Sequence, residues 1–183
     1  MKKYLPISLF ILAFFGYLAW QIADERFFAN AGFASEDKQS KLHYESLFRQ
    51  TRLVTTEGEV IDLAKDHAPV VILNFWASWC SNCMLELPTL IDLKKKFNDR
   101  QLKIITINTD NQNAEDLIKK VSKQLDLFLP VISDVEGSLS RDFNVSGIPV
   151  SFIFKRGELV EVSKGLKDYA SQEMINSINS WQQ

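Results

Sequence analysis

A nearly continuous apolar run over residues 70–77 (VVILNFWA) is followed directly by a cysteine pair, Cys80-Ser81-Asn82-Cys83. The run is rich in β-branched and aromatic residues, which predicts a strand buried on both faces in the centre of a sheet. Pro88 lies inside the next pattern and predicts a kinked helix. That helical pattern covers residues 81–97, with apolar side chains at Leu85, Leu90, Leu93 and Phe97. The two cysteines therefore lie where a buried strand leads into a helix.

The other patterns along the chain predict a mixed α/β domain. In chain order, we expect a hairpin over 52–63, a strand over 103–109, a helix over 113–125 capped by Asn113, a strand over 128–132, a helix over 138–143, a hairpin over 151–163 and a helix over 168–181. Strands that alternate with helices and end in a hairpin are typical of a mixed central sheet with helices on both faces. The first hairpin is then an N-terminal extension of this domain.

The N-terminal segment is apolar enough to cross a membrane. Residues 4–23 contain no charged side chain, and about 20 such residues span a bilayer as a helix. Two lysines precede the segment and two acidic residues follow it, which predicts a cytoplasmic N-terminus. The alternatives are a signal peptide cleaved near the small residues at 29–31, and a buried hairpin helix of the domain itself. A transmembrane signal-anchor over residues 1–23 and a cleaved signal both place the domain in the periplasm or outside a bacterial cell.

A polar stretch separates this segment from the domain. Residues 30–41 are mostly small, polar or charged, and we expect a linker over 24–46 and one domain over 47–183. A length of 183 residues agrees with one domain plus an appendage. The composition is that of a globular protein, and the net charge of −2 comes without the basic stripe of a nucleic-acid-binding domain.

The two cysteines indicate chemistry rather than stabilisation. A disulfide-stabilised secreted domain spreads several cysteines along its length, whereas this chain has one closely spaced pair. A disulfide between them closes a very short loop, where the entropic gain is small. At a helix N-terminus, unpaired N–H groups and the helix dipole lower the pKa of a cysteine and favour the reactive thiolate. We therefore expect Cys80 to be the nucleophile and Cys83 the resolving thiol.

Three other roles of the pair stay open. A zinc site needs four ligands, and the positions of His43 and His67 match no familiar zinc spacing. Two thiolates also suit Cu(I), and a purely structural disulfide is the third alternative. Covalent haem attachment needs a histidine directly after the second cysteine, where this chain has Met84. We expect no bound metal and no cofactor.

The segment NFWASWCSNC, which begins at residue 74 and is followed by a proline five residues later, resembles the signature of the thioredoxin superfamily. Residues 146–152 (SGIPVSF) resemble its cis-proline segment. Residues 83–88 (CMLELP) are similar to the membrane-anchored extracytoplasmic branch of the TlpA and ResA type. The resemblance extends from Phe48 to the C-terminus and implies a thioredoxin-like fold.

The resemblance also implies a role for Glu86. In the TlpA and ResA branch, a glutamate at this position lies beneath the disulfide and handles protons for the thiols, and partial burial would raise its pKa toward neutrality. The alternative is a solvated glutamate that interacts favourably with the helix dipole. Ordinary thioredoxins carry a buried aspartate at the position of Asn74. Because an amide cannot accept the proton of Cys83, Glu86 is the expected proton acceptor.

A second implied feature is a cis peptide bond before Pro149, with an ordinary turn proline as the alternative. A cis bond here would place the Ile148 backbone beside Cys80, where an extended client segment can pair during the mixed disulfide. Trp79 is expected to border the same groove, with plain packing as its alternative role, whereas packing is the favoured role of Trp76 and the groove its alternative. The predicted substrate-binding residues are thus Trp79, Ile148 and Pro149.

The expected function is that of an extracytoplasmic thiol–disulfide oxidoreductase that reduces disulfides of exported client proteins. By resemblance, the first expected clients are apocytochromes c during cytochrome c maturation, followed by copper-site assembly proteins. The chain shows no flavin or nicotinamide motif, so a membrane partner would have to return the electrons. We expect a monomer without a nucleic-acid partner.

Other functions remain as alternatives. An oxidant or isomerase uses the same chemistry, but the Ser81-Asn82 pair lacks the histidine of strong oxidants, which favours a reductant. A non-catalytic Cu(I) carrier is a different class, and the absence of methionine- or histidine-rich tracts disfavours it. A peroxidase of thioredoxin-like fold ranks last because it uses a Thr-x-x-Cys loop.

Overall fold

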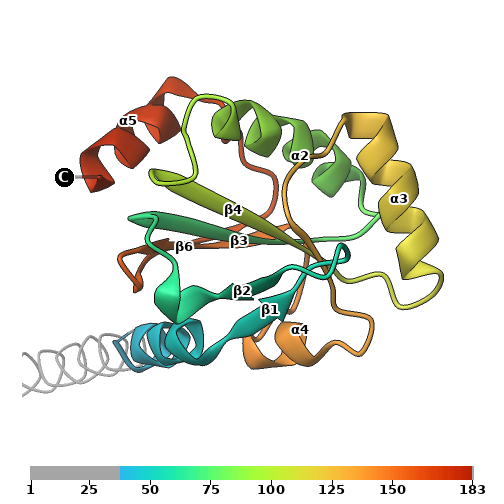
Figure 1. Ribbon diagram of the computed structural model, residues 1–183, viewed down its shortest axis with the longest axis horizontal. Helices are drawn as coiled ribbons and strands as arrows, with labels where there is room; N and C mark the ends of the chain where they lie inside the picture. Colours follow the sequence, from blue (N-terminus) through green and yellow to red (C-terminus); the bar gives the residue numbers. More distant parts are fainter. Residues whose placement is uncertain (1–37, 183) are drawn as a thin grey trace, which may run out of the picture. The chain divides into compact units, whose positions relative to one another are not determined.

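The computed structural model describes residues 38–182, and a five-stranded mixed sheet lies at its centre (Figure 1). The strand order is β5-β4-β3-β6-β7. The strands span Val70–Trp76 (β3), Leu102–Asn108 (β4), Val131–Ser133 (β5), Val150–Lys155 (β6) and Glu158–Lys164 (β7). β3 pairs in parallel with β4 and antiparallel with β6, so the apolar run is the central strand, as predicted.

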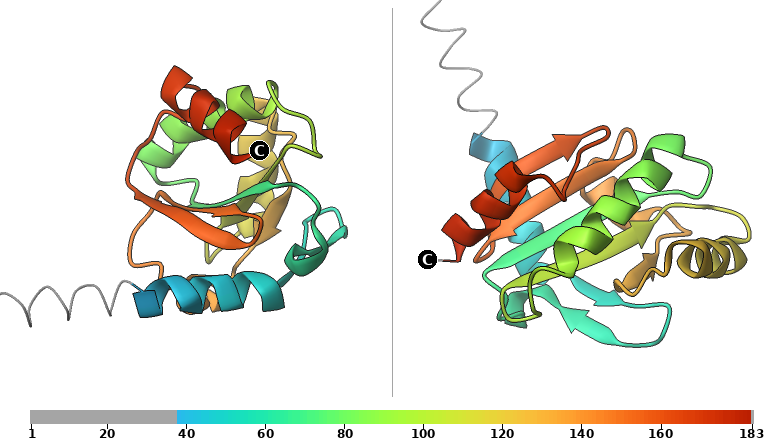
Figure 2. Two further views of the ribbon diagram at one scale, coloured as in Figure 1. Left: turned by 90° about the vertical axis from the view of Figure 1, so that its left-hand side faces the viewer. Right: turned by 90° about the horizontal axis from the view of Figure 1, so that it is seen from above.

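Helices cover both faces of the sheet, which confirms the predicted fold class (Figures 1 and 2). One face carries α2 (Ser81–Lys94), α3 (Ala114–Leu125) and α5 (Gln172–Trp181). The other face carries helical residues 44–50, the predicted hairpin of β1 (Arg52–Val54) and β2 (Val60–Asp62), the short helix η1 (Leu63–Lys65), and α4 (Ser138–Asp142). Side chains of β3 point alternately into these two layers, so the sheet separates two apolar clusters.

The buried face of α2 differs from the predicted one at Leu85, whereas Leu90, Leu93 and, just beyond the helix, Phe97 are buried as predicted. Leu87 is fully buried, whereas Leu85 is 62% exposed. Four residues complete about one helical turn, so Leu87 lies on the same face as Cys83, and Leu85, two residues after Cys83, lies on the opposite face. The position of the cysteine pair against the sheet therefore sets which leucines enter the core.

Replacing Leu87 by alanine is expected to lower the free energy of unfolding by at least about 2 kcal/mol, because the change leaves a cavity in the core. Replacing Leu85 by alanine should cost less than about 0.5 kcal/mol. Denaturant unfolding of the two variants measures both values. Similar losses in the two variants would contradict this orientation of α2.

The first described residues differ from the predicted boundary between linker and domain. Residues 38–50 are helical, although we expected a linker as far as residue 46. The reason is a pair of aromatic side chains one helical turn apart, which pack against β6: the Tyr44 and Phe152 ring centroids lie 4.9 Å apart, and those of Phe48 and Phe154 lie 4.5 Å apart. The chain divides between His43 and Tyr44, and Tyr44 begins the unit that contains the sheet.

The predicted signal-anchor over residues 1–23 and the first part of the predicted linker lie outside the described residues. Within residues 38–182, no helix combines the length and the apolar character that a membrane span needs.

Two other boundaries also differ from the sequence-based expectation. Asn113 precedes α3 in a left-handed conformation with φ 51°, and its side chain makes no capping hydrogen bond. The strand predicted from residue 128 begins at Val131, and Phe128 is exposed. Pro130 lies between them and has no N–H group for a sheet ladder, although its carbonyl accepts a hydrogen bond from the Thr106 N–H.

Candidate active site

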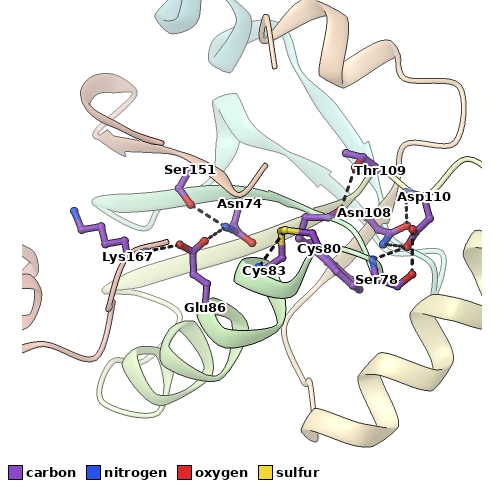
Figure 3. Close-up of a disulfide and its surroundings, with 11 residues drawn as sticks. Asn74, Ser78, Cys80, Cys83, Glu86, Asn108, Thr109, Asp110, Ser151 and Lys167 are labelled. Carbon is purple, nitrogen blue, oxygen red and sulfur yellow. Dashed lines mark hydrogen bonds between the residues drawn. A yellow bond between two sulfur atoms is a disulfide. The ribbon is translucent and has the colours of Figure 1, made fainter. Parts of the chain in front are cut away.

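The cysteine pair lies at the junction of β3 and α2, as predicted, and forms a disulfide (Figure 3). Cys80 is the N-cap residue of α2, and its Sγ accepts a hydrogen bond of 3.1 Å from the Cys83 N–H. Cys83 is fully buried and Cys80 is 7% exposed, directly after the exposed Trp79. Cys80 is therefore the sulfur closer to solvent, and the N–H groups at the start of α2 are placed to stabilise a thiolate there.

Glu86 is buried one turn further along α2, with 2% of its surface exposed. Its Oε1 accepts a hydrogen bond of 2.8 Å from Asn74 Nδ2, and its Oε2 accepts one of 2.8 Å from the Lys167 N–H. Asn74 Nδ2 also donates to Ser151 Oγ at 2.9 Å, which links β3 to β6 (Figure 3). Burial raises the pKa of Glu86, while the two hydrogen bonds and the positive charge of Lys167 oppose that increase.

The segment that covers Glu86 connects β7 to α5, and we call residues 165–171 the strap. Thr89 ties the strap to α2: its hydroxyl donates to the Glu86 carbonyl at 2.8 Å and accepts from the Tyr169 N–H at 3.1 Å. The strap ends at Ser171, whose side chain caps α5. The sequence pattern predicted a helix from residue 168. The cap at Ser171 explains why α5 begins at residue 172 instead.

Tyr169 lies in the strap and is fully buried. Its hydroxyl is near those of Ser151 and Ser163 but makes no hydrogen bond of ordinary length. Burial raises the pKa of Tyr169, and the neighbouring carboxylate of Glu86 raises it further. Tyr169 thus stays neutral.

We expect the free energy of unfolding of the oxidised protein to depend on pH because Glu86 titrates. Because burial raises its pKa in the folded state, the folded state binds this proton more tightly than the unfolded state does. The resulting stabilisation is present below the unfolded pKa and is lost as pH rises through the folded pKa, by about 1.4 kcal/mol for each unit between them.

Glutamine at this position cannot titrate. The free energy of unfolding of the unaltered protein, measured relative to Glu86→Gln, should therefore fall as pH rises through this window. Denaturant unfolding at a series of pH values measures the difference, and Glu57→Gln, at an exposed turn residue, is the matched control. A difference that does not change with pH would contradict a raised pKa.

The predicted cis bond is present between Ile148 and Pro149. The antiparallel ladder of β3 and β6 ends at the pair Phe75 and Val150, so the chain leaves the sheet at the same end toward Pro149 and toward the cysteines. Ile148 packs against the apolar cluster that contains both cysteines. The structure thus brings the two halves of the predicted site together, and binding of a client segment there remains a prediction.

The two tryptophans before the disulfide lie in different environments. Trp76 is fully buried in the apolar cluster beneath α2, so its role is packing, the role that the sequence analysis favoured. The side chain is the last of β3, and the alternation of that strand directs it into the core. Trp79 is 72% exposed next to Cys80 and remains available for contact with a client.

A buried carboxylate that the sequence analysis missed holds the loop before Cys80 (Figure 3). Asp110 accepts hydrogen bonds from the Ser78 N–H at 3.0 Å, the Ser78 hydroxyl at 3.1 Å and Asn108 Nδ2 at 2.8 Å. Asp110 follows β4, whose carboxyl end lies beside that of β3 in a parallel pair. Because the carboxyl ends of adjacent parallel strands lie at the same edge of a sheet, the sequence could have identified Asp110 as a neighbour of the site.

The chemistry available to these residues is the opening and closing of one disulfide. Two electrons and two protons convert the bond between Cys80 and Cys83 into two thiols, and Glu86 is a nearby group that can exchange a proton. Within residues 38–182, no three histidine, cysteine, aspartate or glutamate side chains are grouped so that they could hold a metal ion.

Several named proteins are similar to this chain. Thiol-disulfide oxidoreductase ResA of Bacillus thuringiensis subsp. konkukian is 33% identical over 110 residues, which cover 60% of this chain and 62% of that protein. The chain thus matches less than two thirds of the length of this relative. Sporulation thiol-disulfide oxidoreductase A of Bacillus subtilis is 28% identical over 166 residues, or 90% of each chain.

Solved structures share the fold. StoA from Bacillus subtilis superposes with a TM-score of 0.59 at 25% identity, covering 73% of this chain and 96% of StoA. A putative thiol:disulfide interchange protein DsbE from Chlorobium tepidum gives a TM-score of 0.63 at 25% identity, covering 73% and 93%. These likenesses confirm the thioredoxin-like α/β fold. Residues 46–163, more than half of the sequence, match the AhpC/TSA family, and the chain therefore belongs to that family.

Proposed function

We propose that this protein is a thiol–disulfide oxidoreductase and that Cys80 and Cys83 are its redox centre. The observation that carries the proposal is the disulfide at the N-terminus of α2, with the buried carboxylate of Glu86 one turn away. Two relatives described above are named thiol-disulfide oxidoreductases, which supports the same activity.

In the proposed direction, the reduced protein donates electrons to a disulfide of its client. The Cys80 thiolate attacks one client sulfur, the client disulfide breaks, and the released client thiolate takes up a proton. Cys83 then loses its proton and attacks Cys80 in the mixed disulfide, which restores the bond between Cys80 and Cys83. The second client sulfur leaves as a thiolate and takes up a proton. Two electrons pass to the client, and Glu86 accepts the Cys83 proton.

We further propose where the client binds. Trp79 is exposed directly before the nucleophile, and the Ile148–Pro149 segment reaches the same apolar cluster as the cysteines. The backbone of this segment offers an edge where an extended client chain can pair, and the indole of Trp79 can pack on its side chains.

We also propose that the protein works outside the cytoplasm as a monomer, anchored in the membrane by residues 1–23. The uncharged run after two lysines supports this location. A membrane partner would return two electrons after each cycle. Resemblance to the TlpA and ResA branch suggests apocytochromes c as clients, with copper-site assembly proteins as the second choice.

The reduction potential of the cysteine pair tests the direction of the reaction. The full-length protein is equilibrated with defined ratios of reduced and oxidised dithiothreitol or glutathione, and the thiols are quantified after alkylation. A potential near or below about −270 mV, the value of thioredoxin, would support a reductant. A potential near about −120 mV, the value of strong periplasmic oxidants, would make the protein a disulfide donor instead.

A further inference from the structure

Lys167 interacts with Glu86 in two ways, through its backbone N–H and through the positive charge of its side chain. Its N–H donates to Glu86 Oε2 at 2.8 Å, and its positive charge acts on the same carboxylate. The side chain of Lys167 is not free, because Nζ forms an ion pair with Glu161 of β7. The same Nζ lies 5.7 Å from the centroid of the Tyr169 ring. The ion pair thus links the strap to β7. The strap amide of Lys167 meanwhile binds Glu86 (Figure 3).

Few charged groups share this site. The titratable or charged residues that face Glu86 or pair with a residue facing it are Cys83 on α2, Lys167 and Tyr169 in the strap, and Glu161 on β7. Asn74 on β3 and Ser151 on β6 complete the polar contacts and carry no charge. Among residues 38–182, the charge that acts on Glu86 is therefore the ammonium of Lys167, which is itself paired with the carboxylate of Glu161.

We infer that Lys167 is a positioning residue for Glu86, and that its ion pair with Glu161 sets the pH at which Glu86 exchanges its proton with the thiols. This inference rests on the proposed function, in which Glu86 accepts the Cys83 proton. Lys167 does not touch the reacting sulfur atoms in this account. It acts through the strap amide and through the field of its ammonium group.

An electrostatic role of the ion pair predicts the direction in which the pKa of Glu86 shifts in each variant. A purely structural role does not predict these directions. Removing the ammonium takes away the positive charge that favours the ionised form of Glu86, which raises its pKa. Removing the charge of Glu161 leaves the ammonium uncompensated, which favours the carboxylate and lowers its pKa. A strap that is merely loosened by loss of the ion pair would change both variants in the same direction.

The experiment is a ¹³C NMR titration of the Glu86 carboxyl carbon in the oxidised full-length protein, with the signal assigned through Glu86→Gln. Lys167→Met should raise the midpoint by about one pH unit, and Glu161→Gln should lower it by a smaller amount. Lys167→Arg keeps the charge and should stay close to the unaltered protein. Lys164→Met removes an equal charge from an exposed position on β7 and is the matched control.

The pH profile of disulfide reduction by the same variants links the titration to the reaction. We expect the inflection of the profile to move upward in Lys167→Met and downward in Glu161→Gln. Midpoints that move in the same direction in both variants, or that move no further than in Lys164→Met, would overturn the inference. The NMR midpoint can be measured without turnover. If the midpoints of Lys167→Met and Glu161→Gln shift in opposite directions but the unaltered protein shows no exchange activity, the proposed function is contradicted. The electrostatic role of Lys167 is then still supported.

Discussion

Replacement of Cys80 by serine is expected to reduce thiol–disulfide exchange to the rate of the uncatalysed reaction. The attacking species is a thiolate, and a serine hydroxyl stays protonated at neutral pH even at a helix N-terminus. Cys83 cannot take over the attack, because it is fully buried in the oxidised protein. Reduction of a model disulfide protein such as insulin, followed by turbidity, measures the loss.

Replacement of Cys83 by serine is expected to give a different outcome. Cys80 still attacks the client, but no second thiol resolves the mixed disulfide, so the covalent complex accumulates. Non-reducing electrophoresis detects this complex, and its client can be identified after reduction. Leu85→Ala, at an exposed position of the same helix, is the folded control and should keep its activity. Exchange at an unaltered rate in the Cys80 variant would rule out this site as the redox centre.

The largest expected loss of stability follows from replacing Phe152 by alanine, at about 4 kcal/mol. Phe152 is buried at the centre of an aromatic group on β6, with ring centroids 4.9 Å from Tyr44, 5.1 Å from Phe143 and 5.9 Å from Phe75. The change removes the packing of a large side chain and its aromatic contacts at once.

Denaturant unfolding of the oxidised protein measures this loss, with Phe128→Ala as the matched control. Phe128 is 56% exposed, so its removal should change the free energy of unfolding by less than about 1 kcal/mol. Comparable losses in the two variants would show that residues 44–50 and α4 do not pack over β6 as described.

Local patterns were sufficient to predict most of the elements. The continuous apolar run gave a strand buried on both faces, and the junction with Cys80 was predicted from the same segment. What could not be predicted was the contact partner of each helix. Leu85 and Leu87 are chemically alike, and only the packing of α2 on the sheet makes one exposed and the other buried.

The environment of Glu86 likewise combines features that the local sequence predicted with contacts that it could not predict. Its place one turn after Cys83 was predicted, as was the raised pKa that follows from burial. Its partner Lys167 and the anchoring residue Thr89 could not be predicted, since they meet only when the strap folds over α2. Such contacts depend on the path of a loop, which carries no periodic signal.

The contacts of Glu86 also join distant parts of the chain. Lys167 lies 81 residues after it, and the Asn74 amide that binds it also binds Ser151, 77 residues further along the chain from Asn74. Until β3, β6 and the strap have assembled, Glu86 is an ordinary hydrated carboxylate beside two ordinary thiols. Its altered titration therefore indicates that the tertiary fold is complete. A chain that has formed only α2 carries the whole motif, but the burial and the contacts that alter the titration of Glu86 arise only with tertiary assembly.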